Sequence, residues 1–367
     1  MAVVAPTYLS EPPHPLFTGE AWWIWGPDTP WTPPADPRPV QCRYFARAVD
    51  LAAGERVVLA LSADTRYMLY TNGAVAARGP QKGDVAHQFY DILDLTACLR
   101  TGRNVLLLRV DSGARSFASF PHTGPSASEM SAVPLFTADG YRLDADGSVR
   151  ERLCAGEDWR VSVDPALTFP ADPDRPSFVG PKERIDFRQL PAGFYAQPDL
   201  AGAAWHTATK LWPAVTPQTA EDPGLPHRLL PRSIAPLHLE PGRFETALAT
   251  GDAPPSDGPA PFRVRVPART RARWLLDAGT LLTAYPELAM NGGTGATIRL
   301  TYAEHLIRKG DKAFGPPETS DELCGYSDQI TCGNGHSAWN PLHWRTFRYV
   351  ELTVETQEEP LAITDLA

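Results

Sequence analysis

The segment Arg56-Val-Val-Leu-Ala-Leu-Ser62, followed by Tyr67-Met-Leu-Tyr70 and then Asn72-Gly73, decides the expected fold. Its apolar residues come in short runs that are bounded by turn residues, which is typical of strands. Asn-Gly favours a two-residue hairpin turn, because both central positions of such a turn need positive φ. The segment therefore predicts an antiparallel hairpin.

The same pattern recurs along the chain. The 38 prolines and 28 glycines are spread over all 367 residues and interrupt any long helical period. We predict an all-β fold of antiparallel β-sandwiches, with short helices or turns in the connections. Further predicted strands are Asn104–Val110, Phe262–Val266, Arg273–Asp277, Thr297–Tyr302 and Phe347–Val354.

Three proline-rich stretches mark possible boundaries: Gly26–Pro39, Trp212–Pro236 and Gly251–Pro261. The second separates two strand-rich blocks, whereas the third is short enough to be a loop. We therefore predict two domains, residues 1–232 and 233–367.

Charge and cysteine content argue against several classes of function. The net charge is −9 and no Lys/Arg cluster is present, so nucleic acid is not an expected partner. Neither a leader peptide nor an apolar run of about 20 residues is seen, so we expect no membrane partner and a cytoplasmic location. The five cysteines are odd in number, and the spacing of Cys324, Cys332 and His336 is too wide for a usual zinc site. No metal and no cofactor are predicted.

The first block resembles the N-terminal jelly-roll of bacterial α-L-rhamnosidases of glycoside hydrolase family 78. The resemblance rests on these segments, in this order: Ala21-Trp-Trp-Ile-Trp-Gly26, Arg43-Tyr-Phe45, Leu61–Gly73, Arg78-Gly-Pro80, Asp94-Leu-Thr96 and Leu99–Val105. It is weaker between the two blocks, where Asp158-Trp-Arg160, Glu183–Arg188 and Ala204-Trp-His206 keep the order usual in that family.

The second block resembles the concanavalin-like sandwich that precedes the catalytic domain in the same family. The matching residues are Leu276-Asp-Ala-Gly279, Tyr285-Pro-Glu-Leu288, Gly292–Ala296, Tyr302-Ala-Glu304, Asp328, Trp339-Asn-Pro341 and Arg345–Val350. One departure is His343-Trp344-Arg345-Thr346, where many members have a glycine before the Phe-Arg-Tyr.

The resemblance implies an inverting hydrolase that removes terminal α-L-rhamnose, with its two carboxylates on an (α/α)6 barrel. An inverting pair stands about 6.5–9.5 Å apart. A barrel of packed helices does not fit a chain with this density of Pro and Gly. We therefore expect a non-catalytic region whose partners are a catalytic barrel, in cis or in trans, and a rhamnose-containing carbohydrate.

No catalytic residue is predicted in this chain. Glu304 follows the family pattern, but we interpret it as a charge pair with Arg345 or Arg348, or as a contact to the next domain. Strand alternation sends Trp22 and Ile24 to one face and Trp23 and Trp25 to the other, so one pair is core and the other covers a domain or a sugar. The predicted carbohydrate or interdomain contacts are Trp22, Trp25, Glu304, Trp339, Trp344 and Arg345.

Three hypotheses remain open. An accessory region predicts a broad exposed apolar surface near the second sandwich. An autonomous carbohydrate-binding protein predicts a groove with an aromatic platform and convergent polar groups. A self-sufficient glycosidase predicts that turnover depends on Glu304.

Overall fold

The structure is a computed structural model that describes residues 5–26, 40–83, 87–112, 134–164, 166–170, 180–191, 193–220, 227–306, 323 and 326–367. The chain divides into two compact units. Unit 1 consists of Met1–Asp164 and Pro191–Leu237, and unit 2 consists of Pro165–Leu190 and His238–Ala367.

Unit 1 contains two sheets. The eight-stranded sheet runs in the order β1 (Thr7–Tyr8), β7 (His87–Asp94), β4 (Arg56–Asp64), β9 (Leu135–Leu143), β2 (Thr18–Trp25) and β15 (Thr209–Val215), with β10 (Val149–Arg152) beside β9 and β16 (Arg228–Pro231) beside β7. The six-stranded sheet runs β14 (His206–Thr207), β11 (Arg160–Ser162), β3 (Gln41–Leu51), β8 (Gly102–Ser112), β5 (Arg66–Thr71) and β6 (Ala74–Gly79).

Both faces of the eight-stranded sheet of unit 1 are buried. One core cluster joins residues of both sheets, among them Ile24, Phe45 and Leu108. A second cluster, which includes Trp23 and Tyr141, packs residues of the eight-stranded sheet with those of nearby loops. Burial on both faces explains why β4 is buried at every position after Arg56 and contains the continuous apolar run Val57–Leu61 instead of an alternating pattern.

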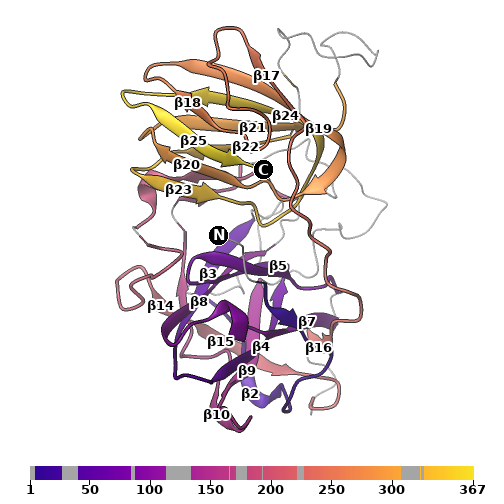
Figure 1. The fold of residues 1–367 in the computed structure, drawn as a ribbon. Coiled ribbons are helices and arrows are strands. Elements are labelled where there is room, and N and C mark those ends of the chain that lie inside the picture. Colours follow the sequence, from indigo (N-terminus) through magenta and orange to yellow (C-terminus); the bar gives the residue numbers. More distant parts are fainter. Residues whose placement is uncertain are drawn as a thin grey trace. The chain divides into compact units, whose positions relative to one another are not determined.

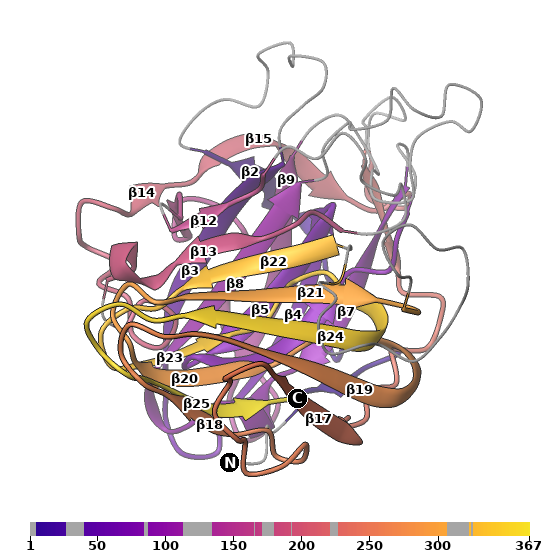
Figure 2. The same cartoon turned by 90° about the horizontal axis from the view of Figure 1, so that it is seen from above.

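Unit 2 is a sandwich of two sheets. The seven-stranded sheet runs β12 (Leu167–Thr168), β13 (Arg184–Asp186), β22 (Tyr326–Thr331), β21 (Thr297–Ala303), β24 (Arg345–Glu355), β19 (Arg271–Ala284) and β17 (Thr246–Thr250). The four-stranded sheet runs β18 (Val264–Val266), β25 (Leu361–Leu366), β20 (Leu288–Gly292) and β23 (His336–Trp339). Figure 1 shows the four strands of the smaller sheet as neighbours, and Figure 2 shows β22, β21, β24 and β19 side by side.

The long strands of the seven-stranded sheet point alternate side chains to an inner, apolar face and to an outer, mostly polar face, although Thr301, Glu351 and Thr353 on the outer face are also buried. In β19, Ala272, Trp274 and Leu276 are buried, whereas Arg271 and Arg273 lie on the other face and are at least partly exposed. The buried side chains of β21, β22 and β24 share the face of Trp274 through the strand register. This period of two fixes which polar residues reach solvent.

The predicted domains, 1–232 and 233–367, need one correction. Residues 165–190 belong to unit 2, although the sequence places them before the predicted boundary. The reason is strand pairing: β13 joins β22 in parallel, with Ile185 opposite Ile330. A strand of three residues has too few positions to show a period in the sequence.

The predicted fold class is confirmed, since the described residues form antiparallel β-sandwiches. Their helical structure is limited to two 3-10 turns, η1 (Thr96–Cys98) and η2 (Phe187–Gln189). Within the described residues, no helix has the length and apolar character needed to cross a membrane. The Asn72-Gly73 hairpin turn is confirmed as well, with φ of 50° and 92°.

Gly73 and Gly102 together give a test of this turn. Both have φ near 90°, but an added Cβ at Gly73 would lie 2.9 Å from Ala196 Cβ, whereas at Gly102 nothing lies within 4 Å. We expect Gly102→Ala to lower the free energy of unfolding of unit 1 by about 1–2 kcal/mol, from backbone strain alone. Gly73→Ala adds a steric clash and loses more, as measured by urea denaturation.

The double variant Gly73→Ala with Ala196→Gly isolates the clash. It should recover the extra loss and leave only the strain seen in Gly102→Ala. Equal losses for Gly73→Ala and Gly102→Ala would contradict the packing of this turn against Ala196.

Candidate functional site

One polar cluster of unit 2 is buried between its sheets. Asp328 lies on β22 at an inward position, and Arg345 begins β24. Arg345 donates from Nε to Asp328 Oδ2 at 2.8 Å and from Nη2 to Oδ1 at 2.9 Å. The two planar groups therefore form a bidentate pair, the strongest geometry for such a contact.

A second carboxylate, that of Glu183, completes the cluster. The Glu183 backbone N–H donates to Asp328 Oδ1 at 2.7 Å. The Glu183 carboxylate accepts from Trp339 Nε1 at 3.3 Å and from the Leu342 N–H at 3.2 Å. Arg345 Nη2 also donates to the Pro181 carbonyl at 3.2 Å. The cluster thus attaches the 180–186 segment to the sheet.

The environment of this cluster favours a structural role over catalysis. Arg345 and Asp328 are 0% exposed and Glu183 is 1% exposed, so substrate and water have no access. Burial raises the pKa of Asp328 above its usual range, and the positive charge of Arg345 opposes that rise. Two carboxylates that are both engaged by fixed donors cannot act as an acid and a base for a sugar.

Glu304 lies on the surface, one residue after the end of β21. The predicted charge pair with Arg345 or Arg348 is not the one formed. Arg345 pairs with Asp328, and Arg348 donates to Asp277 at 2.9 Å. Because Glu304 is exposed, the alternative of a contact to a further domain stays a prediction.

The first tryptophan pair, Trp22 and Trp25, is divided between interior and surface. Trp25 is 0% exposed and packs in the core between the sheets, 5.6 Å from the Phe45 ring centroid. Trp22 is half-buried, with Lys210 Nζ 5.6 Å from its ring centroid. Trp23 is also fully buried and belongs to the second core cluster, so both faces of β2 pack inside unit 1. Trp25 therefore does not provide the predicted contact with a carbohydrate or another domain, and for Trp22 that contact stays a prediction.

The second set, Trp339, Trp344 and Arg345, is also mostly internal. Trp339 is 4% exposed and donates to Glu183, and Arg345 is fully buried. Neither can contact a sugar at the surface. Trp344 is half-buried on the turn before β24 and remains a candidate contact.

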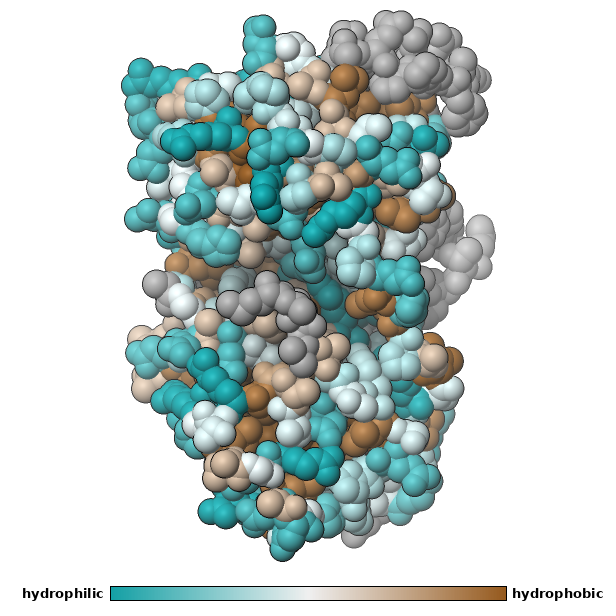
Figure 3. Space-filling model, viewed as in Figure 1, coloured by the Kyte–Doolittle hydropathy of each residue, from teal (hydrophilic) through white to brown (hydrophobic). Residues whose placement is uncertain are grey.

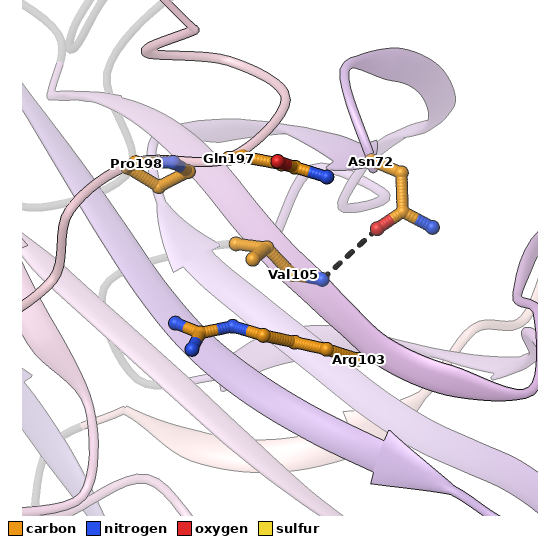
Figure 4. A pocket seen from close by; sticks show the side chains of 5 residues that line it. All are labelled: Asn72, Arg103, Val105, Gln197 and Pro198. Atoms are coloured by element: carbon orange, nitrogen blue, oxygen red, sulfur yellow. Dashed lines mark hydrogen bonds between the residues drawn. The ribbon is translucent and has the colours of Figure 1, made fainter.

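A pocket of about 250 Å³ lies in unit 1, beside the Asn72-Gly73 turn. Figure 4 shows the Gln197 side chain extending toward Asn72 above Val105, with Arg103 on the other side of Val105. Asn72 is held in place because its Oδ1 accepts from the Val105 N–H at 3.1 Å and its Nδ2 donates to Asn104 Oδ1 at 2.9 Å. Arg103 and Gln197 are exposed. Pro198 completes the lining.

The pocket can bind a small polar group but cannot hydrolyse one. Its lining contains amides, one guanidinium and two apolar side chains, with no carboxylate, thiol or imidazole. It also holds no aromatic ring, so it lacks the platform that the hypothesis of an autonomous carbohydrate-binding protein predicts.

The apolar surface predicted for unit 2 is less extensive than expected. Among the residues of unit 2 that the structure describes, the exposed large apolar side chains are Leu239, Leu248 and Leu281, on the connecting segment, the edge strand β17 and the irregular part of β19. On the face drawn in Figure 3, apolar side chains form small areas separated by polar ones. These side chains therefore give little support to a broad apolar surface that would contact a catalytic barrel.

The cysteines give no indication of a metal site in the part of the chain that the structure describes. Cys332 is buried, and burial raises its pKa to about 12, which keeps the thiol protonated at neutral pH. Cys324, the other member of the Cys324–Cys332–His336 spacing, lies outside the described residues.

Comparison with known proteins supports the resemblance on two levels. Residues 268–366 match the family model of the bacterial alpha-L-rhamnosidase concanavalin-like domain. A glycoside hydrolase family 78 rhamnosidase from a Bacillus species aligns with a TM-score of 0.64 and 15% identity, over 95% of this chain and 54% of that chain. No curated protein matches the sequence.

Two other solved structures align in the same way. An α-L-rhamnosidase from Aspergillus terreus has a TM-score of 0.55 and 16% identity, over 95% of this chain and 36% of that one. The Streptomyces avermitilis α-L-rhamnosidase in complex with L-rhamnose has a TM-score of 0.53 and 20% identity, over 88% and 29%. The resemblance to α-L-rhamnosidases is confirmed, and this chain spans about half or less of the length of these enzymes.

Arg345→Met tests the buried cluster. Removing one partner of a buried pair leaves an uncompensated charge, so we expect a loss of about 3–5 kcal/mol in the free energy of unfolding of unit 2. The control is Arg348→Met, whose pair with Asp277 is partly exposed and should contribute less. Denaturation with urea measures both, and equal losses would contradict the structural role of Arg345.

The pH dependence of the Arg345→Met loss gives a second signature. The pKa of Asp328 is already raised by burial, and losing Arg345 raises it further. Between the ordinary and the raised pKa the folded state binds more protons than the unfolded state, so stability falls as the pH rises through that window. The Arg345→Met loss should therefore be smaller near about pH 4 than at about pH 7. A loss that grows on acidification would exclude Asp328 as its cause.

Proposed function

We propose that this chain is the non-catalytic accessory region of an α-L-rhamnosidase-like glycoside hydrolase. The observation that carries the proposal is the match of residues 268–366 to the concanavalin-like domain of bacterial α-L-rhamnosidases. The alignment of nearly the whole chain with part of each of three rhamnosidases supports it further. The enzyme as a whole would remove terminal α-L-rhamnose from glycans or glycosides.

The catalytic carboxylates are assigned to an (α/α)6 barrel, in cis or in trans. The chemistry of the described residues supports this assignment. Asp328 and Glu183, two carboxyl groups of unit 2, are sealed in the core, and the pocket of unit 1 contains no carboxylate. An inverting hydrolase needs one accessible acid, one accessible base and room for water between them.

The roles left for this chain are support of the barrel and contact with the substrate. The partly exposed candidates for such contacts are Trp22, Glu304 and Trp344. Each offers a group that can contact a sugar or a domain surface: an aromatic ring in Trp22 and Trp344, and a carboxylate in Glu304.

Glu304→Gln tests the proposal in a protein that joins this chain to an α-L-rhamnosidase barrel. We expect turnover of p-nitrophenyl α-L-rhamnoside to stay within roughly tenfold of the unsubstituted protein, because Glu304 transfers no proton. Initial rates of p-nitrophenol release provide the measurement. The matched control is Glu358→Gln, another exposed carboxylate of unit 2.

A fall in kcat of about a hundredfold or more for Glu304→Gln alone, with unchanged thermal stability, would contradict the proposal, because losses of that size mark a general acid or base. It would favour the hypothesis that the sandwiches carry a catalytic residue.

A further inference from the structure

One row of side chains crosses all seven strands of the larger sheet of unit 2, on its outer face. The strand register places these residues opposite one another in the order Thr250, Arg273, Thr353, Arg299, Gln329, Arg184 and Thr168. Arginine occupies every second strand from β19 to β13. The strands between and beside these carry threonine or glutamine. We call this set the arginine row.

Strand geometry sets the spacing of the row. Neighbouring strands lie about 4.8 Å apart, so arginines on alternate strands are separated by about 10 Å. Strand alternation turns all seven side chains to the same face, away from Trp274 and Leu300, which are 0% exposed. In Figure 2 the strands β22, β21, β24 and β19 run side by side, so the row crosses them at a right angle to the chain direction.

Arg299 and Arg184 are the available cations of the row. Both are exposed, and neither forms an ion pair with any residue that the structure describes. Arg273 is already engaged, because it donates from Nε to Thr250 Oγ1 at 3.0 Å and lies 3.6 Å from Glu351. The row therefore offers two unneutralised guanidinium groups with the Gln329 amide between them.

The neighbouring carboxylates do not cancel these charges, because they have partners of their own. In the adjacent row, Glu355 pairs with Arg271 at 3.3 Å and Asp186 pairs with Arg188 at 2.7 Å. A surface on which acids are neutralised and two arginines are free attracts anions, although the chain as a whole carries a net charge of −9.

We propose that the arginine row binds an acidic polysaccharide that carries a carboxylate on alternate sugars. Guanidinium groups bind carboxylates in a bidentate manner, and the Gln329 amide between Arg299 and Arg184 suits the hydroxyl groups of the intervening sugar. An extended pyranose chain advances by roughly one strand spacing per sugar, so alternate carboxylates match alternate strands. The proposal rests on the proposed carbohydrate role and assigns it a substrate class.

Calorimetric titration of the whole chain with hyaluronan oligosaccharides, which carry a carboxylate on alternate sugars, tests the proposal. We expect saturable binding that weakens as salt is added, and no binding of neutral dextran. Arg299→Gln and Arg184→Gln should each lower the affinity by roughly tenfold, the loss of one charged hydrogen-bonding group. The matched control is Arg265→Gln, because Arg265 is an exposed strand arginine of the four-stranded sheet.

Absence of binding, or equal losses for Arg265→Gln and Arg299→Gln, would overturn the proposal. Equally tight binding of single-stranded DNA with the same arginine dependence would also overturn it, by showing a general polyanion surface. These outcomes are independent of the Glu304→Gln assay. If the chain does not bind hyaluronan but the protein joined to a barrel is active, only the proposed role of the arginine row is refuted. If the chain binds hyaluronan but the joined protein is inactive, the proposed role in an α-L-rhamnosidase is refuted.

Discussion

The buried pair of Arg345 and Asp328 is the interaction on which unit 2 depends. Both side chains are 0% exposed, and removing a charge from water costs free energy. The opposite charge and the fixed dipoles of neighbouring backbone groups offset that cost. The pair also involves the Glu183 N–H and the Pro181 carbonyl, which come from a distant part of the sequence. The charge requirement thus helps to attach the 180–186 segment to unit 2, where β13 extends the seven-stranded sheet.

This arrangement connects fold and function through the outer face of that sheet. Once β13 is attached to β22, the sheet gains a further strand, and Arg184 comes into register with Gln329 and Arg299. The inner face of the same strands is apolar except for the charge cluster. The interior therefore supplies rigidity, and the outer face is free to present polar groups at a regular spacing.

Much of the fold could be predicted from the sequence, and much of the site could not. Local signals sufficed for the hairpin at Asn72-Gly73, for β4 and β8, which contain apolar runs, and for β21 and β24, in which apolar and β-branched residues are interspersed with polar ones. Trp25, Trp339 and Arg345 are predicted from the sequence to contact a carbohydrate or another domain, yet all three are buried. A sequence does not show what covers a side chain. Arg345 in particular is buried by a partner on another strand. The arginine row was invisible, since it appears only when strands that are distant in sequence are placed in register.

We propose that these two sandwiches support an α-L-rhamnosidase without containing its catalytic site. The most direct measurement is the rate of p-nitrophenol release from p-nitrophenyl α-L-rhamnoside by the purified 367-residue chain alone. The account predicts a rate equal to that of buffer, because its buried carboxylates are inaccessible and its pocket holds none. Turnover above buffer that scales with the amount of the chain would contradict it.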